Sequence, residues 1–159
     1  MRPDIVIFAT GNPSRGDDAI GPLLLERLRA WLPGEPQGVR FELVEDFQLQ
    51  VEHALDLEAR ALALFIDAGS ATPAPFHFAA VRAAADFTHT SHALSPAAVL
   101  HVYERLQGRP APAAFVLCVR GVSFELGAPV SAAAQCHLEA AWVKLQTLCR
   151  EPSAMAWGV

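Results

Sequence analysis

The sequence predicts an α/β fold, a three-layer, doubly wound, mostly parallel sheet with helices on both faces. Two observations predict it. Short apolar runs typical of buried strands alternate along the chain with segments whose apolar residues recur at helical spacing. No internal repeat, low-complexity tract or linker interrupts this alternation. We therefore expect one α/β domain over residues 1–150, with right-handed crossovers, and a loose C-terminal tail over residues 151–159.

The predicted strands differ in how their apolar residues are arranged. Ile5–Thr10 is apolar almost throughout and is closed by Gly11, which suits a strand buried on both faces of a parallel sheet. Residues 39–44 alternate apolar and polar side chains. The remaining predicted strands are residues 61–66, Phe76–Val81 and residues 113–119.

The predicted helices are supported by spacing and by capping residues. Residues 19–32 carry apolar side chains three or four positions apart and stop before Pro33. A helix over residues 96–106 has Ser95 as its N-cap and Pro96 at its first position, both of which are favoured there. The other predicted helices are residues 51–59 and 132–148, and residues 71–75 form a proline-containing loop.

The charge balance disfavours a nucleic-acid partner. The chain of 159 residues has 12 Lys and Arg against 17 Asp and Glu, with a net charge of -5 and no basic cluster. Nucleic-acid binding depends on Lys and Arg that neutralise phosphates, so this class of partner is not expected. No apolar run approaches the roughly 18–20 residues of a membrane span, and the N-terminus leads directly into a strand. The sequence therefore predicts a soluble, cytoplasmic protein.

The cysteines do not indicate a disulfide or zinc framework. They number three, an odd count, and no two of them have C-x-x-C spacing. Cys118 lies within an apolar strand pattern, which predicts a small residue of the core.

The loop after the first strand has the glycine spacing of a phosphate-binding loop but the wrong charges. Gly11 and Gly16 give G-x-x-x-x-G, yet Asp17-Asp18 stand where such a loop needs Lys and Ser or Thr. Two carboxylates would repel a phosphate, and the spacing does not match the dinucleotide-binding pattern either. A bound cation fits better, and no tightly bound organic cofactor is expected. The competing interpretation is that Asp17 caps the helix over residues 19–32 while Asp18 interacts with the dipole of that helix.

Two more side chains belong to the same expected edge of the sheet. Asp67 follows an apolar strand, where a carboxylate either bonds to turn amides or meets a ligand. His92 lies in a polar loop before Ser95, and it either faces solvent or points inward. With Asp18, these residues would make an oxygen and nitrogen site for a divalent transition metal, which can polarise a carbonyl or activate water. A serine hydrolase built on Ser91 or Ser95 is disfavoured because no G-x-S-x-G motif is present.

These motifs resemble those of the hydrogenase maturation endopeptidases over nearly the whole chain. The residues that carry the resemblance are, in order, Gly11-Asn12, Asp17-Asp18, Gly21, Asp67-Ala68-Gly69 and His92. Residues 48–57, 90–96, 117–121 and 124–127 look most like members that process NAD-reducing or bidirectional [NiFe] hydrogenases.

The resemblance implies a hydrolase, a metal-dependent or nickel-licensed endopeptidase. It would remove a C-terminal peptide from the nickel-loaded precursor of the hydrogenase large subunit. Asp18, Asp67 and His92 would be both the catalytic and the metal-contacting residues, with nickel supplied by the substrate. The family often has glutamate at the second acidic position, so Asp18 places its carboxylate about one methylene shorter.

Three further residues are candidates for binding the substrate, namely Asn12, Arg15 and Gln48. Arg15 either contacts a substrate carboxylate or pairs with Asp17, and Gln48 would stand on the rim of the site. A monomer is expected, because the sequence has no large apolar stripe. The alternative function is a non-catalytic module that binds or delivers nickel during hydrogenase assembly.

Overall fold

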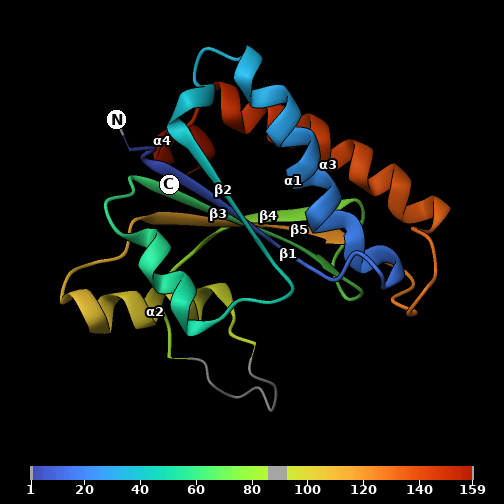
Figure 1. Cartoon of the computed structure of the whole chain (residues 1–159), viewed down its shortest axis with the longest axis horizontal. Coiled ribbons are helices and arrows are strands. Elements are labelled where there is room, and N and C mark those ends of the chain that lie inside the picture. Colours follow the sequence, from blue (N-terminus) through green and yellow to red (C-terminus); the bar gives the residue numbers. More distant parts are fainter. Residues whose placement is uncertain (1, 86–92, 159) are drawn as a thin grey trace.

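The described residues form one five-stranded sheet, with the strand order β2-β1-β3-β5-β4 (Figure 1). The structure is a computed structural model, and it describes residues 2–85 and 93–158. The strands are β1 (Ile5–Thr10), β2 (Phe41–Asp46), β3 (Leu62–Gly69), β4 (Phe76–Val81) and β5 (Ala113–Arg120). The longer helices are α1 (Ile20–Trp31), α2 (Pro96–Gln107) and α3 (Ala132–Arg150). Among the described residues, no helix is both long and apolar enough to span a membrane.

The sheet is parallel except at one edge. β1 pairs in parallel with β2 and β3, and β3 pairs in parallel with β5. Only β4 is antiparallel, and it lies outside β5. The predicted doubly wound, mostly parallel fold is confirmed.

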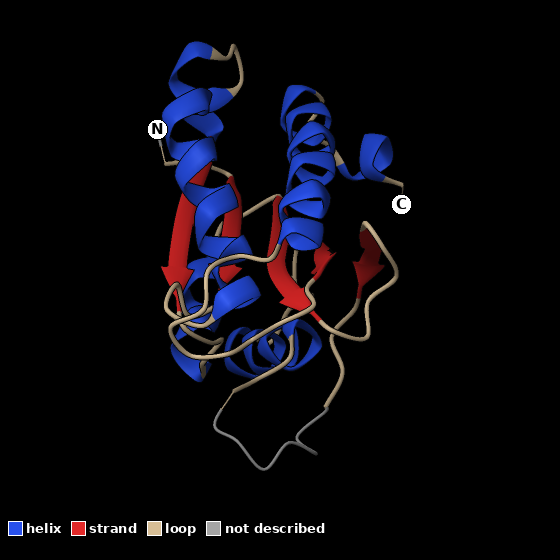
Figure 2. Cartoon of the chain, turned by 90° about the vertical axis from the view of Figure 1, so that its right-hand side faces the viewer, coloured by secondary structure: helices blue, strands red, loops and turns tan. Residues whose placement is uncertain are grey.

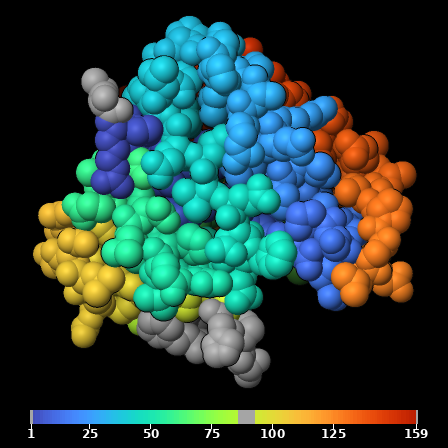
Figure 3. All heavy atoms as spheres, viewed as in Figure 1, coloured from blue at the N-terminus to red at the C-terminus, as the bar shows by residue number. Residues whose placement is uncertain are grey.

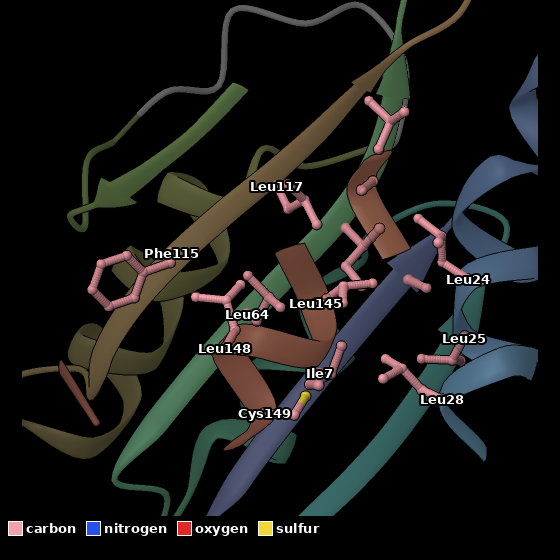
Figure 4. Packing of buried hydrophobic residues seen from close by; sticks show 14 of the residues in the cluster. Ile7, Leu24, Leu25, Leu28, Leu64, Phe115, Leu117, Leu145, Leu148 and Cys149 are labelled. Atoms are coloured by element: carbon pink, nitrogen blue, oxygen red, sulfur yellow. The ribbon is translucent and has the colours of Figure 1, made fainter. Parts of the chain in front are cut away.

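Helices cover both faces of the sheet, which gives three layers (Figures 1 and 2). Alternate residues of a strand face opposite sides, and β1 shows this clearly. Ile5 and Ile7 pack with α1 and α3 in one apolar cluster, part of which is drawn in Figure 4. Val6 and Phe8 pack in a second cluster with α2 and with η4, a 3-10 helix over Val51–Leu57. Burial on both faces is the reason why Ile5–Thr10 is almost uniformly apolar.

Several boundaries differ from the sequence prediction for local reasons. The second strand begins at Phe41 rather than residue 39, because Gly38–Arg40 form a 3-10 turn before it. The second predicted helix is 3-10 rather than α, and it has a capping box made by Gln50 and His53. β3 continues to Gly69, so Asp67 lies inside the strand and pairs with Cys118 of β5.

The C-terminal residues are not the loose tail that the sequence predicted. Ala154–Trp157 form a short helix, α4, and the Trp157 side chain is buried against Phe78 and Phe115. Its indole N–H donates to the Leu148 carbonyl at 3.0 Å. Packing of the Trp157 side chain therefore holds this end of the chain against the sheet.

The strand order places β1 and β3 side by side, at the point where the chain connections diverge to opposite sides. From β1 the chain moves to β2 on one side, and β3 then enters on the other side of β1. Ligands of doubly wound proteins bind outside the carboxyl ends of the strands where such connections diverge. We call this the carboxyl edge, and in Figure 2 it faces the viewer, with the loops that follow the strands in front.

Candidate active site

A cavity of about 460 Å³ opens at the carboxyl edge, on the face that η4 and α2 cover. Three neighbouring strands supply its floor through alternate residues that share this face. An apolar row, Phe8, Phe65 and Val116, lies beneath a polar row, Thr10, Asp67 and Cys118. The remaining described lining residues are Asp18, Phe47, Gln48, Leu49, Ile66, Ala93, Leu94, Ser95, Pro96 and Leu117. The cavity therefore has apolar walls and carries two carboxylates, those of Asp18 and Asp67.

Asp18 reaches the cavity from the turn between β1 and α1. This turn includes a short 3-10 helix, η1, over Gly16–Ala19. The Asp18 carboxylate accepts a hydrogen bond from the backbone N–H of Asn12 at 2.7 Å, and its own N–H donates to the carbonyl of Arg15 at 3.0 Å. Gly11, at φ 147, is required here because a Cβ would lie 2.0 Å from the Asp18 carbonyl oxygen. The Asp18 side chain is half-buried, with its backbone and one carboxylate oxygen held by the turn.

The pKa of the Asp67 carboxyl is raised by its surroundings. Desolvation by the surrounding protein is the largest cause and raises its pKa to about 6, opposed by a hydrogen bond from the Ala68 N–H. The negative charge of Asp18 raises the pKa further, whereas a hydrogen bond from Thr10 lowers it. Asp67 is nevertheless exposed to solvent at the cavity surface. A carboxyl with such a pKa can gain or lose a proton near neutral pH, as a general acid or base must.

Asp17 has a different position from the one predicted as a cap. It is not hydrogen-bonded to the start of α1, and its side chain is completely buried. Its carboxylate instead accepts hydrogen bonds from Val122, Ser123 and Ser131, in the loop that leads to α3. The capping interpretation of Asp17 is wrong because long-range donors at the α3 N-terminus outcompete the local helix.

One wall of the cavity is the loop between β2 and η4, which carries Gln48. The buried imidazole of His53 accepts a hydrogen bond from the Gln50 N–H at 2.8 Å through Nδ1. This bond leaves the proton on Nε2, which lies 3.4 Å from an oxygen of Asp46. His53 therefore holds the loop at both ends. Figure 3 shows the β2 and η4 segments, cyan to green, on the surface beside the blue N-terminal loop.

The structure brings some of the predicted site residues together and leaves others apart. Asp18, Asp67 and Gln48 line one cavity, and Asn12 contributes its backbone N–H to Asp18. Arg15 is exposed and is not among the described residues that line the cavity. Of the two alternatives for Arg15, the pairing with Asp17 is not found among the ion pairs of the described residues.

The third predicted ligand, His92, lies outside the described residues. Ala93, the next residue in the chain, lines the cavity, and the Leu94 N–H donates to the Leu49 carbonyl at 3.0 Å. Ser95 caps α2 through a hydrogen bond from the Ala98 N–H, as predicted, so its hydroxyl is engaged. Within residues 2–85 and 93–158, no three His, Cys, Asp or Glu side chains are grouped closely enough to hold a metal ion. The role of the predicted trio as metal ligands stays a prediction.

The sequence interpretation missed two cavity residues. Cys118 was predicted to be a small core residue, but it is half-buried and faces the cavity beside Asp67, with its Sγ 2.9 Å from the hydroxyl of Thr72. Thr10 was treated only as the end of a strand, yet it lines the cavity and its side chain lowers the pKa of the Asp67 carboxyl. Alternation along the strands would have found both, since each lies two residues beyond an apolar residue of the same face.

The comparison with solved structures decides the fold. An endopeptidase from Escherichia coli, solved in solution, is 23% identical with a TM-score of 0.70, and the match covers 96% of this chain and 94% of that one. The fold is that of the hydrogenase maturation endopeptidases. The hydrogenase maturating endopeptidase HybD from E. coli is 21% identical, with a TM-score of 0.69 and coverage of 96% and 94%.

A third solved structure extends the likeness to an archaeon. The [NiFe] hydrogenase maturation protease HycI from Thermococcus kodakarensis is 21% identical with a TM-score of 0.67, covering 92% of each chain. No protein-family model and no curated protein matches the sequence. The fold of the described residues therefore agrees with the resemblance noted in the sequence motifs.

Proposed function

We propose that this protein is an endopeptidase that removes a C-terminal peptide from the nickel-loaded precursor of a [NiFe] hydrogenase large subunit. One observation carries the proposal. The carboxylates of Asp18, from the turn after β1, and Asp67, from the end of β3, line a single cavity at the carboxyl edge of a fold shared with hydrogenase maturation endopeptidases. The cavity is large enough to admit a segment of polypeptide.

The two carboxylates suit peptide hydrolysis that depends on an ion. Carboxylate oxygens and an imidazole nitrogen are ligands for divalent transition metals, and such an ion can polarise a peptide carbonyl or lower the pKa of water. Asp18, Asp67 and His92 would contact nickel that arrives in the precursor. Because two or three ligands make a weak site, affinity is completed only when the substrate supplies its own ligands. Cleavage would then be conditional on nickel insertion.

The remaining features of the proposal concern the setting of the reaction. We infer a cytoplasmic monomer whose partner is the large-subunit precursor, of the NAD-reducing or bidirectional class. Asn12, Arg15 and Gln48 would contact the substrate around the cavity. The raised pKa of Asp67, about 6, keeps this carboxyl mostly ionised at neutral pH and close to the range in which it can take up a proton.

The deciding experiment is cleavage of a nickel-loaded precursor, followed by mass spectrometry of the product. We expect a shortened large subunit with the wild-type protein and loss of cleavage with Asp18→Asn, Asp67→Asn and His92→Ala. Glu45→Gln is the matched control, because Glu45 is an exposed carboxylate at the end of β2 that does not line the cavity. Transfer of nickel without cleavage would favour the alternative delivery module. Stoichiometric nickel or zinc that stays with the isolated protein through chelation would contradict an ion supplied by the substrate.

A further inference from the structure

The two adjacent aspartates after β1 have opposite environments. Asp18 faces the cavity, whereas the Asp17 side chain is 0% exposed. The Asp17 carboxylate accepts from the Val122 N–H at 2.7 Å, the Ser123 N–H at 2.9 Å and the Ser131 hydroxyl at 2.8 Å through one oxygen. Its other oxygen accepts from the Ser131 N–H at 2.7 Å. The backbone N–H of Asp17 also donates to the Ser123 carbonyl at 2.8 Å.

These donors explain why the buried residue is an aspartate. An ionised carboxylate only accepts hydrogen bonds, so it can take all four donors, whereas an asparagine amide would turn an NH2 group toward some of them. Burial alone would raise the pKa of Asp17, but the hydrogen bonds from Ser123, Ser131 and Val122 outweigh it and hold the pKa below its usual value. Ser131 is the N-cap of α3, and the positive end of that helix dipole also favours the charge. The charge is therefore stably buried without a cationic partner among the described residues.

The same contacts fix the turn that carries Asp18. Gly16 has φ 55, and a Cβ there would lie 2.5 Å from the Ser123 carbonyl oxygen, so the turn is pressed against the loop between β5 and α3. A second connection is the hydrogen bond from the Gly127 N–H to the Ser14 carbonyl at 2.7 Å. Figures 1 and 3 show the two segments side by side, the loop before α3 in orange and the N-terminal loop in blue.

We propose that Asp17 is a positioning residue that holds the Asp18 carboxylate in the cavity by anchoring its turn to the loop before α3. Asp17 touches neither the cavity nor, on this proposal, the substrate. It acts through Asp18, the next residue in the chain. The Asn12 N–H, which donates to the Asp18 carboxylate, limits how that side chain can turn. The acidic pair thus divides into one structural and one functional carboxylate. The inference rests on the proposed function only in naming the cavity as the place of cleavage.

The test compares Asp17→Asn with a control that loosens the fold elsewhere. Leu138→Ala is suitable because Leu138 is a buried residue of α3 in the apolar cluster on the other face of the sheet, and it does not line the cavity. Temperatures are chosen so that both variants are equally far below their melting points. Two quantities are measured, the NMR signal and hydrogen exchange of the Asn12 amide without substrate, and kcat and KM for precursor cleavage.

A positioning role predicts a specific pattern. In Asp17→Asn the Asn12 amide loses its hydrogen-bonded shift and exchanges faster than in Leu138→Ala. The kcat falls about 10- to 100-fold while KM changes little, because a misplaced carboxylate weakens the transition state more than substrate binding. Leu138→Ala keeps the wild-type kcat. If Asp17→Asn does not fold, Ser131→Ala removes one of the four donors and should shift the Asn12 amide in the same direction by less.

Two results would overturn the proposal. One is an Asn12 amide in Asp17→Asn that matches the wild type, and the other is an equal loss of kcat in Leu138→Ala. Failure of the proposed function is distinguishable from both. If the wild-type protein cleaves no precursor, the endopeptidase assignment falls, while the Asn12 amide still decides whether Asp17 holds Asp18.

Discussion

Asp67 lies in the same cavity as Asp18, and desolvation together with the negative charge of Asp18 raises the pKa of its carboxyl to about 6. The folded state therefore binds a proton at Asp67 more tightly than the unfolded chain does. Stability from this group is present below its usual pKa of 3.8 and is lost as the pH rises through about 6. The ionised Asp67 carboxylate thus lowers the stability of the fold at neutral pH.

The Asp67→Asn variant is expected to lose this pH dependence. Urea unfolding followed by circular dichroism between pH 4 and pH 7, a window taken from the two pKa values, should show a flatter stability profile than the wild type. Thr10→Val, which removes a hydrogen bond that lowers the pKa of Asp67, should move the Asp67 titration to higher pH in carbon NMR. An unchanged titration in Thr10→Val would show that Thr10 does not hold the carboxylate.

Cysteine labelling should report occupancy of the cavity. Cys136 is exposed, Cys118 is half-buried with its pKa raised by desolvation, and Cys149 is buried with its pKa raised to about 12. Because the thiolate is the reactive form, iodoacetamide should label Cys136 first, Cys118 slowly and Cys149 only on unfolding. A bound precursor should protect Cys118 and leave Cys136 unaffected, as measured by peptide mass spectrometry. Equal protection of both would place the substrate elsewhere.

The buried Arg60 should matter more for stability than the half-buried Arg40. Arg60 donates to the carbonyls of Pro3 and Asp56 and to the Glu42 carboxylate, and its side chain is 0% exposed. Arg60→Ala leaves these acceptors unpaired and should lower the free energy of unfolding by about 2–4 kcal/mol.

Arg40→Ala is the matched control for this comparison. Arg40 forms an ion pair with Asp4, and the two side chains are 36% and 39% exposed. Loss of this pair should therefore cost only about 0.2–1 kcal/mol. Similar losses in the two variants, measured by urea unfolding, would contradict the assignment of Arg60 as a buried structural cation.

Trp157 is expected to be a main contributor to stability near the C-terminus. It is 5% exposed and contacts Phe78 and Phe115, so Trp157→Ala should lower the free energy of unfolding by about 3–5 kcal/mol. Met155→Ala serves as the control, because Met155 is 84% exposed, and it should change stability by less than about 0.5 kcal/mol. A negligible effect of Trp157→Ala in thermal unfolding would restore the prediction of a loose tail.

Local chemistry made much of the fold predictable. Ile5–Thr10 was located to the residue because burial on both faces leaves an unbroken apolar run. The start of α2 at Pro96 followed from Ser95 as N-cap, an interaction contained within four residues. The second strand was misplaced by two residues because nothing in the apolar pattern shows the turn at Gly38–Arg40.

The candidate site was predictable only in outline. Asp18 and Asp67 were expected to converge because parallel strands end at one edge, and they do line one cavity. The adjacent Asp17 was misjudged, since the Ser131 donors that bind it lie more than a hundred residues away in the chain.

By itself, the sequence determined the succession of strands and helices, their caps and the acidic character of the carboxyl edge, because these depend on periodicity and on neighbours within a few residues. Only the tertiary structure decided that Asp17 is buried against the loop before α3, that Cys118 joins Asp67 on the cavity floor, and that Trp157 is buried. Those outcomes depend on donors and apolar surfaces brought together from distant segments. These hydrogen bonds and apolar contacts form only after the sheet has brought the segments together.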